Sequence, residues 1–306
     1  MTAVRVAVFA SRVRADEKRI MEALGRHGLR YEHVDTRAYW SFAGEPRPPW
    51  SIVLNREIAH TRAVYAARML EALGGTVVNS AAATETCGDK WRTSLALRAA
   101  GLPTPRTALG LTPDAALAAL EAIGYPAVVK PLVGSWGRLV TRVQDGHMAA
   151  TVMEYLDVLP APQSRIVYVQ ELVDKPGRDI RVIVVGGEAV GATYRHGDQW
   201  RTNVARGAES RPCPLTADLA GLAVRAAAAV GADVAGVDLV ESGDGELFVL
   251  EVNHGVEFSG FQRAVGDRVD VAGRIAGHVA ALAERAAAAT DAPDAGDAAP
   301  AAWAGA

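Results

Sequence analysis

The stretch GVDLVESGDGELFVLEVN, residues 236–253, contains two short apolar runs separated by a polar segment. The pair Asp244-Gly245 between two β-type runs is a strong signal for a hairpin with a two-residue turn. Such a turn places Asp238 opposite Glu251, and side-chain alternation puts Glu251 and Asn253 on one face of their strand. Two carboxylates and an amide oxygen then converge on one point.

These oxygen-bearing side chains support two interpretations. Hard oxygen ligands suit Mg²⁺, and Mg²⁺ sites with few protein ligands commonly use substrate phosphates as well. The alternative is a solvated hairpin with ordinary surface carboxylates. The position of the acids inside apolar strands favours the metal site, whereas the cost of desolvating unpaired carboxylates weighs against it.

Length and composition limit the remaining possibilities. A chain of 306 residues exceeds a typical single domain, and a net charge of −3 implies no strong general attraction to nucleic acid. Cys87 and Cys213 form no CxxC and no Cys/His cluster, which indicates a reducing compartment and argues against structural zinc. The apolar run at 1–9 is too short for a signal peptide or membrane span, so we expect a cytoplasmic protein without a membrane partner.

Hydrophobic patterning divides the chain into three domains and a tail. Residues 1–90 alternate strands with helices, which predicts a small parallel α/β layer, and no GxGxxG motif follows the first strand. Residues 91–172 and 173–287 mix helices with strand pairs. The tail, 288–306, is rich in Ala, Asp, Pro and Gly and is expected to be disordered. The expected helices cover 16–27, 59–73, 90–100, 113–123, 214–230 and 271–287.

Lysines and a glycine-bearing turn precede the hairpin. Lys130 ends an apolar strand, and the turn 134–138 could bring its backbone N–H groups close to an anion. Lys90 begins a predicted helix, where its charge opposes the helix dipole unless a polyanion is bound. A lysine at a strand edge and an ordinary turn are the structural alternatives. Arginines between 178 and 206 suit carboxylate and phosphate recognition, or form a basic surface paired to acids elsewhere.

Together and in this order, these elements resemble the ATP-grasp carboxylate–amine ligases of the RimK branch. The similarity is closest to the LysX/ArgX type, which works with the small amino-group carrier protein LysW. The segments that look like this type are CGDKW at 87–91, KPLVGSWGR at 130–138, KPGRDIRV at 175–182, CPLT at 213–216 and EVNH at 251–254.

The resemblance implies an ATP-grasp fold of the α/β (α+β) class, with the nucleotide site between the central and C-terminal domains. It implies ATP and two Mg²⁺ ions, held by Asp238, Glu251 and Asn253. The implied ATP-binding residues are Lys90, Lys130, Gly134, Ser135, Trp136, Gly137, Arg138, Glu171, Val173, Asp179, Arg195 and Asn203, with 134–138 as a lid. The implied catalytic residues are Arg195 and Asn203, and the implied substrate contacts are Arg195, Asn203, Glu257, Phe258, Gly260 and Phe261.

The activity implied by the resemblance is a ligation in two steps. The carboxylate of the carrier's C-terminal glutamate side chain attacks the γ-phosphate of ATP, and the α-amine of an amino acid then attacks the acyl phosphate. No protein nucleophile is required, so catalysis depends on positioning and on neutralising phosphoryl charge. The family also implies a homo-oligomer, either a dimer or a tetramer.

The pair Gly260-Phe261 marks specificity in this family. Gly-Phe goes with glutamate, and Asn-Thr or Asn-Ala goes with α-aminoadipate. The physical reason is steric: a phenylalanine shortens the pocket by about one methylene, which discriminates between the two substrates by about 1–3 kcal/mol. The leading expectation is therefore a glutamate–carrier ligase of arginine/ornithine-type or specialised amino-acid biosynthesis. The alternatives are an α-aminoadipate–LysW ligase of lysine biosynthesis, a RimK-like peptide or protein glutamate ligase, and an inactive nucleotide-binding scaffold; Phe261 could also be simple loop packing.

Overall fold

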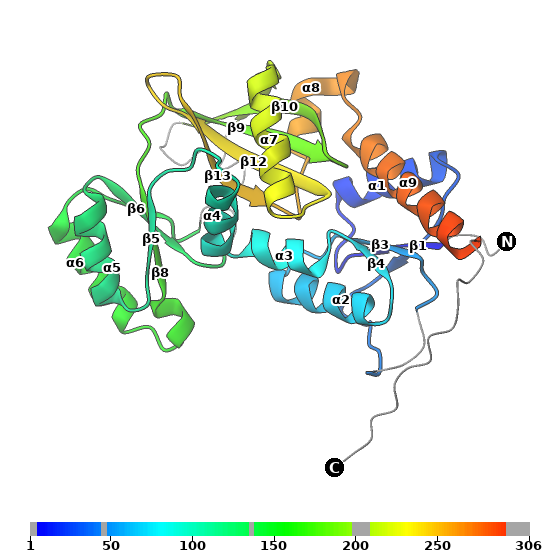
Figure 1. Ribbon diagram of the computed structural model, residues 1–306, viewed down its shortest axis with the longest axis horizontal. Coiled ribbons are helices and arrows are strands. Elements are labelled where there is room, and N and C mark those ends of the chain that lie inside the picture. The colour runs from blue at the N-terminus through cyan, green and yellow to red at the C-terminus, as the bar shows by residue number, and fades with distance from the viewer. Residues whose placement is uncertain (1–4, 44–47, 135–137, 198–208, 292–306) are drawn as a thin grey trace, which may run out of the picture.

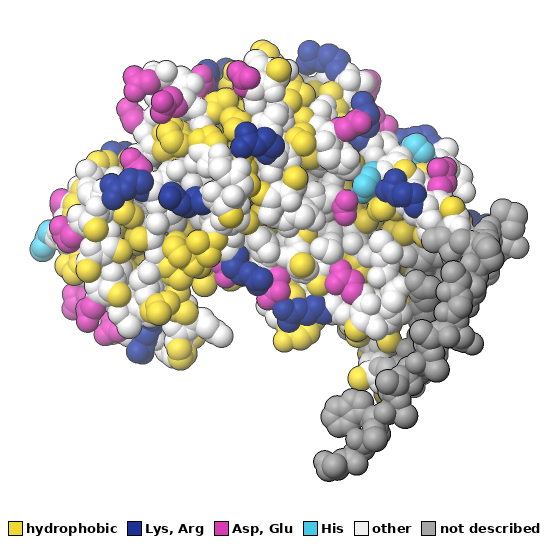
Figure 2. Space-filling model, viewed as in Figure 1, with side chains coloured by type: hydrophobic (Ala, Val, Ile, Leu, Met, Phe, Trp, Pro, Cys, Tyr) yellow, Lys and Arg dark blue, Asp and Glu magenta, His cyan; other side chains and the backbone are white. Residues whose placement is uncertain are grey.

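Three β-sheets organise the chain, which the computed structural model describes over residues 5–43, 48–134, 138–197 and 209–291. The third sheet lies between the other two: the first sheet is on one side of it, and the central sheet with its two helices projects from the opposite side (Figure 1). Basic and acidic side chains are interspersed over the face seen in Figure 2, in keeping with the small net charge.

The first sheet has the order β2-β1-β3-β4, and all its strand pairs are parallel, which confirms the predicted α/β layer. Its strands are β1 (Arg5–Phe9), β2 (Arg30–Val34), β3 (Ile52–Asn55) and β4 (Thr76–Val78), and its helices are α1 (Ala15–Arg26) and α2 (His60–Ala72). Successive residues of β1 face opposite sides: Val6 and Val8 share a core with α1, whereas Ala7 and Phe9 share a core with α2. Burial on both faces explains the uninterrupted apolar sequence of this strand.

The central sheet has the order β5-β8-β6-β7 and is antiparallel. It consists of β5 (Thr107–Gly110), β6 (Ala127–Pro131), β7 (Thr141–Val143) and β8 (Val167–Glu171), and it carries α5 (Pro113–Ile123), α6 (Gly146–Asp157) and the short η1 (Pro162–Arg165). Leu120 of α5, Met153 of α6 and Val129 of β6 belong to a core of its own. The sequence predicted α5 and β6 with their observed bounds but neither β5 nor α6.

The third sheet has the order β11-β10-β9-β12-β13 and is also antiparallel. It consists of β9 (Arg178–Val185), β10 (Glu188–His196), β11 (Glu209–Cys213), β12 (Val234–Glu241) and β13 (Leu247–Asn253). One face carries α3 (Ala81–Gly88), α4 (Lys90–Ala99) and α7 (Ala217–Ala229). The predicted hairpin at Gly186-Gly187 is confirmed, and both glycines have the positive φ that its turn requires, 58° and 82°.

The other face of the third sheet is shared with the first layer. Ile183 of β9 belongs to the same core as Val8 and Ile20, together with α8 (Ser259–Val265) and α9 (Val271–Asp291); η3 (Gly266–Arg268) joins these two helices. Helix α9 lies against α1 (Figure 1). It continues to Asp291, four residues into the predicted tail 288–306, whose disorder stays a prediction. The remainder of that tail lies outside the described residues.

Packing relates the sheets to the predicted domains. Helix α4 follows the predicted boundary at 90, yet its Leu97 is buried in the core of the third sheet. A hydrophobic core of the structure can therefore include residues from two predicted domains. The predicted domain limits of 90, 172 and 287 stay a prediction. Within the described ranges, no helix is both long enough and apolar enough to cross a membrane.

Candidate active site

The β12–β13 hairpin pairs Asp238 with Glu251, as predicted. The predicted two-residue turn is wrong, however, because Glu241 pairs with Leu247 and the loop between them is longer. The Ser242 N–H donates to the C=O of Glu246 at 2.9 Å, and Gly245 has a φ of 83°, as in three-residue hairpin loops that end in a left-handed residue. A register shift after Asp238 restores the predicted pairing.

The register shift is a bulge at Leu250, and it determines which side chains face the site. Val249 and Val252 both lie in the core of the third sheet and are fully buried. In a regular strand, residues three positions apart face opposite sides of the sheet. The extra residue of the bulge therefore allows Val249 and Val252 to face the same core. Glu251 and Asn253 consequently face a cavity on the other side of the strand.

Asp238 is bound by two arginines. Arg181 donates from Nε and Nη2 to the two carboxylate oxygens at 2.7 Å each, and Arg195 Nη2 lies 3.2 Å from Oδ2. Burial alone would raise the pKa of Asp238, but the charges of Arg181 and Arg195 outweigh it and hold the pKa well below its usual range. Asn253 Nδ2 lies 3.3 Å from Asp238 and 3.4 Å from Glu251, so the three predicted metal ligands are brought together.

Arg195 is almost completely buried and lies between two carboxylates. Its Nε donates to Oδ1 of Asp179 at 2.5 Å, while its Nη2 faces Asp238. Lys175 Nζ is 3.7 Å from the other oxygen of Asp179. Burial disfavours the charge of Arg195, but the two carboxylates raise its pKa overall. Arg195 is therefore a fixed cation, and Asp179 contributes to the site by holding it.

Lys130 lies at the end of β6, as predicted. Its Nζ donates to Oε1 of Gln170 at 2.6 Å and lies 5.7 Å from the ring centroid of Tyr168. Burial lowers the pKa of Lys130 to about 8, although the nearby charge of Glu251 acts in the opposite direction. A lysine held at this cost beside a carboxylate is typical of a site that binds an anionic ligand.

Lys90 begins α4, as predicted, and its helix is capped by the preceding aspartate. Asp89 Oδ1 accepts from the N–H of Trp91 at 2.9 Å and of Arg92 at 3.0 Å. The Lys90 ammonium donates to the C=O of Gly134 at 2.9 Å, and burial lowers its pKa. The first residue of the predicted lid is thus linked to the start of α4.

A cavity of 490 Å³ lies among these groups. Six residues predicted from the sequence to contact nucleotide, metal or both lie in its wall, namely Lys90, Gly134, Arg138, Arg195, Glu251 and Asn253. The predicted substrate contact Glu257 lies there as well. Four other predicted site residues, Ser135, Trp136, Gly137 and Asn203, lie outside the described residues. Glu171 ends β8, where its carboxylate accepts from the Arg106 N–H at 3.1 Å, and Val173 follows it.

The predicted specificity residues lie apart from this wall. Phe258 is fully buried and Phe261 is 3% exposed, and both belong to the core shared by the first and third sheets. The Phe261 ring covers Gly191 of β10 so closely that a Cβ there would lie 2.8 Å from Cζ. Phe261 therefore packs in a hydrophobic core, which is the alternative considered for it above. Its effect on substrate choice stays a prediction.

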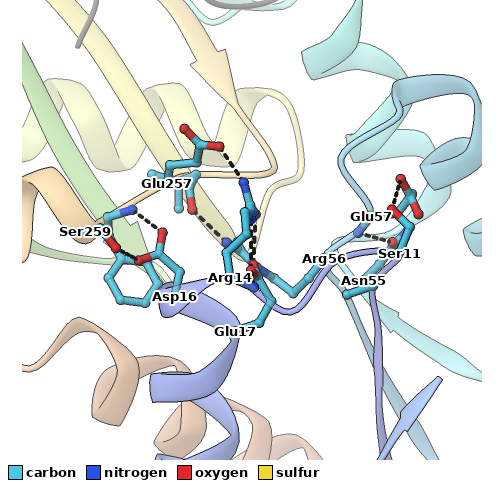
Figure 3. Close-up of polar contacts among 12 residues, drawn as sticks. Ser11, Arg14, Asp16, Glu17, Asn55, Arg56, Glu57, Glu257 and Ser259 are labelled. Atoms are coloured by element: carbon cyan, nitrogen blue, oxygen red, sulfur yellow. Dashed lines mark hydrogen bonds and ion pairs between the residues drawn. The ribbon is translucent and has the colours of Figure 1, made fainter. Parts of the chain in front are cut away.

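The first layer supplies cavity residues that the sequence did not indicate, including Arg14, Arg56, Glu57 and His60. Figure 3 shows how Arg14 and Arg56 reach toward the segment after β13. Arg56 Nε donates to Oε1 of the fully buried Glu17 at 3.0 Å, and its Nη2 donates to the C=O of Val256 at 3.0 Å. Asp16 accepts from the Phe258 N–H at 2.9 Å and from the Ser259 hydroxyl. The contacts with Val256, Phe258 and Ser259 join positions 200 or more residues apart, so no local motif signals them.

Comparison with known proteins agrees with this geometry. Residues 87–279 match the model of the RimK-like ATP-grasp domain, and residues 6–86 match that of the LysX preATP-grasp domain. The chain is 32% identical over 284 residues to the glutamate–LysW ligase ArgX of Sulfolobus acidocaldarius, covering 90% of this chain and 98% of that protein. It is 32% identical over 246 residues to the α-aminoadipate–LysW ligase LysX of the same organism, covering 79% and 89%.

A solved structure has the same architecture. The RimK domain ATP-grasp protein from Sphaerobacter thermophilus has a TM-score of 0.75 and 29% identity, covering 90% of this chain and 99% of that chain. Matching models cover nearly all the described residues, and the cavity wall includes Lys90, Glu251 and Asn253. The chain belongs to the RimK-like ATP-grasp family.

Proposed function

We propose that this protein is an ATP- and Mg²⁺-dependent ligase that joins the α-amine of glutamate to a small LysW-type carrier protein. The bond forms at the side-chain carboxylate of the carrier's C-terminal glutamate. The observation that carries this proposal is the cavity in which Lys90 and Arg195 face Glu251 and Asn253. Two relatives that cover 90% of this chain are named glutamate–LysW ligases.

Glu251 and Asn253 are the residues that we propose to hold Mg²⁺ from the cavity wall. Carboxylate and amide oxygens fit the preference of this ion. Both oxygens of Asp238 already accept from Arg181, so Asp238 would complete the set only where that guanidinium yields. When bound, Mg²⁺ would neutralise phosphate charge, and two ions are proposed, as in the resemblance.

ATP is proposed to bind between the central and the third sheet. Lys90 and Lys130 supply charge for the phosphates, and the turn 134–138 covers them. Glu171 and Val173 border the proposed adenine pocket at the end of β8. Asp179 acts indirectly, because its ion pair keeps Arg195 in place.

The chain's own residues position two reactants and stabilise charge. In the first step the carrier carboxylate attacks the γ-phosphorus, ADP leaves, and an acyl phosphate forms. In the second step the amine of glutamate attacks the acyl carbon, loses a proton, and expels phosphate, which leaves an isopeptide bond. Arg195 and Asn203 are proposed to stabilise the charge that develops on phosphate and substrate.

α-Aminoadipate is the second candidate substrate. The buried position of Phe261 is the observation that supports this second candidate. The ring does not line the cavity, so it does not shorten the cavity by direct contact. We also propose a homo-oligomer, which is supported by family resemblance. A location in the cytoplasm is proposed as well, and the free thiols of Cys87 and Cys213 support it.

The test is ADP release by the purified protein with ATP, Mg²⁺, a purified LysW-type carrier and either glutamate or α-aminoadipate. We expect release that requires the carrier and is faster with glutamate, together with a carrier whose mass increases by one glutamyl unit. Release without any change in the carrier would refute the ligase. Faster release with α-aminoadipate would replace glutamate by the second candidate.

A further inference from the structure

Arg14, immediately before α1, lies between two carboxylates of very different exposure. Its Nε and Nη2 donate to the two oxygens of Glu17 at 2.9 and 2.8 Å, and the Glu17 side chain is 0% exposed. Its Nη1 donates to Oε1 of Glu257, whose side chain is 47% exposed. Both Arg14 and Glu257 lie in the wall of the cavity, and Figure 3 shows their side chains meeting.

This arrangement fixes the guanidinium and leaves one corner of it facing the cavity. Glu17 also accepts from the backbone N–H of Arg14 at 3.0 Å and from Arg56, so the buried carboxylate and the inner edge of the arginine hold each other. A guanidinium that is already ordered loses little conformational entropy when a ligand binds. The exposed Glu257 is held far less firmly, because ion pairs open to solvent contribute little to stability.

Three other arginines of the wall, Arg56, Arg181 and Arg195, have buried partners. Arg56 binds the buried Glu17, and Arg181 and Arg195 both bind the buried Asp238. Displacing either carboxylate would leave a buried charge without its counter-ion, which is strongly unfavourable. Among these four arginines, Arg14 is the one whose partner on the cavity side can exchange with a ligand.

We propose that Arg14 anchors a carboxylate of the amino-acid substrate, and that Glu257 occupies this anchor until the substrate displaces it. The inference rests on the proposed function, since it assigns the end of the cavity at the first layer to the amino acid. Glutamate carries two carboxylates, and a charged fork that is fixed on one edge accepts either of them with charge-assisted hydrogen bonds. Glu257 then acts as an internal competitor for the site.

The experiment measures equilibrium binding of L-glutamate by calorimetry, with Mg²⁺ and a non-hydrolysable ATP analogue present. Arg14→Gln should weaken binding by about tenfold or more, the size expected for losing a charge-assisted hydrogen bond. Glu257→Gln removes the competing charge and leaves Arg14 bound to Glu17, so glutamate should bind about threefold more tightly. The affinity for the ATP analogue should stay unchanged in both variants.

Arg26→Gln is the matched control. Arg26 ends α1, the helix that follows Arg14, and pairs with Asp270 at 3.2 Å. This exposed ion pair also joins distant parts of the chain, but Arg26 does not line the cavity. Its removal should leave glutamate affinity unchanged. Glutamine and the α-amide of glutamate identify the anchored carboxylate, because the analogue that lacks it should bind wild type and Arg14→Gln equally.

Several outcomes would overturn the inference. Equal glutamate affinity in wild type and Arg14→Gln would do so, as would weaker binding in Glu257→Gln, which decides the matter alone if Arg14→Gln does not fold. Loss of affinity for the ATP analogue as well as for glutamate in Arg14→Gln would indicate a merely structural role. If wild type neither binds glutamate nor releases ADP with it, the proposed function itself fails.

Discussion

Asp238 and Glu251 lie directly opposite each other across β12 and β13, yet only Glu251 faces the cavity. Arg181 covers both oxygens of Asp238, and the aspartate side chain is almost fully buried. The two carboxylates of this pair therefore have different tasks. Glu251 is available to a ligand, whereas Asp238 holds two arginines in place.

Substitutions at the two positions should separate these tasks. Glu251→Gln should abolish Mg²⁺-dependent ADP release and leave the free energy of unfolding nearly unchanged, because Glu251 is only weakly bound by protein groups. Asp238→Asn should lower the free energy of unfolding by about 3–5 kcal/mol, since Arg181 and Arg195 lose their buried counter-ion. Urea denaturation and an ADP-release assay measure the two effects. A Glu251→Gln protein with normal activity would contradict the proposed metal site.

ATP affinity should depend on the charge of Lys130. Burial lowers its pKa from 10.5 to about 8, so the side chain loses its proton in the folded apoprotein as the pH rises through 8. Nucleotide affinity should therefore fall above about pH 8. The free energy of unfolding should change in the opposite sense, because between pH 8 and 10.5 the unfolded chain binds the extra proton, and stability rises with pH there.

Lys130→Arg tests whether this one group is responsible. An arginine stays charged throughout this range, so the variant should lose the decline in nucleotide affinity between pH 7.5 and about 9.5. Fluorescence titration with an ATP analogue at several pH values measures the affinity. The same decline in wild type and Lys130→Arg would show that another group titrates.

Gly88 should be required for the position of His60 in the cavity wall. A Cβ at Gly88 would lie 1.8 Å from Cε1 of His60, so the ring must move in Gly88→Ala. We expect the free energy of unfolding to fall by about 1–3 kcal/mol, as for other overpacked sites. Adding His60→Ala should remove this penalty. Gly221→Ala in α7, where a Cβ meets nothing within 4 Å, is the control and should stabilise by roughly 0.5–1 kcal/mol.

The Gly260→Asn/Phe261→Thr variant should shift preference from glutamate toward α-aminoadipate. The expected change in the ratio of kcat/KM is roughly 10-fold to 150-fold, as for one methylene in a pocket. Because the Phe261 ring is buried against Gly191, stability should also fall by about 3 kcal/mol. Phe258→Leu, at a neighbouring buried ring, should reduce stability without changing preference. Unchanged preference in the double variant would show that Phe261 contributes to core packing and does not select the substrate.

The sequence predicted features that depend on short spacing. Alternation along β13 and the Asp244-Gly245 signal placed Asp238 opposite Glu251 correctly, although the loop is one residue longer and a bulge compensates. The start of α4 at Lys90 and the bounds of α5 were also confirmed, because an aspartate or threonine cap and a proline mark them locally.

Features that depend on contacts between distant segments were not predicted. The ion pair of Arg14 and Glu257 and the bond from Arg56 to Val256 join the first layer to the segment after β13. Neither end of such a contact carries a pattern of its own. Glu17 accepts from the backbone N–H of Arg14 three residues before it, as the acid of a capping box does, and this local contact indicates only that a helix begins there.

The packing of α9 against α1 has a consequence for biosynthesis. The apolar residues Ile20 and Leu24 of α1 are synthesised early, but part of the surface that covers them, including Ile275 and Val279, belongs to the last described helix. The first layer therefore cannot be completed while the ribosome still holds the C-terminal segment. The central sheet, whose core is formed by residues 108–169, has no such delay and can finish folding before it.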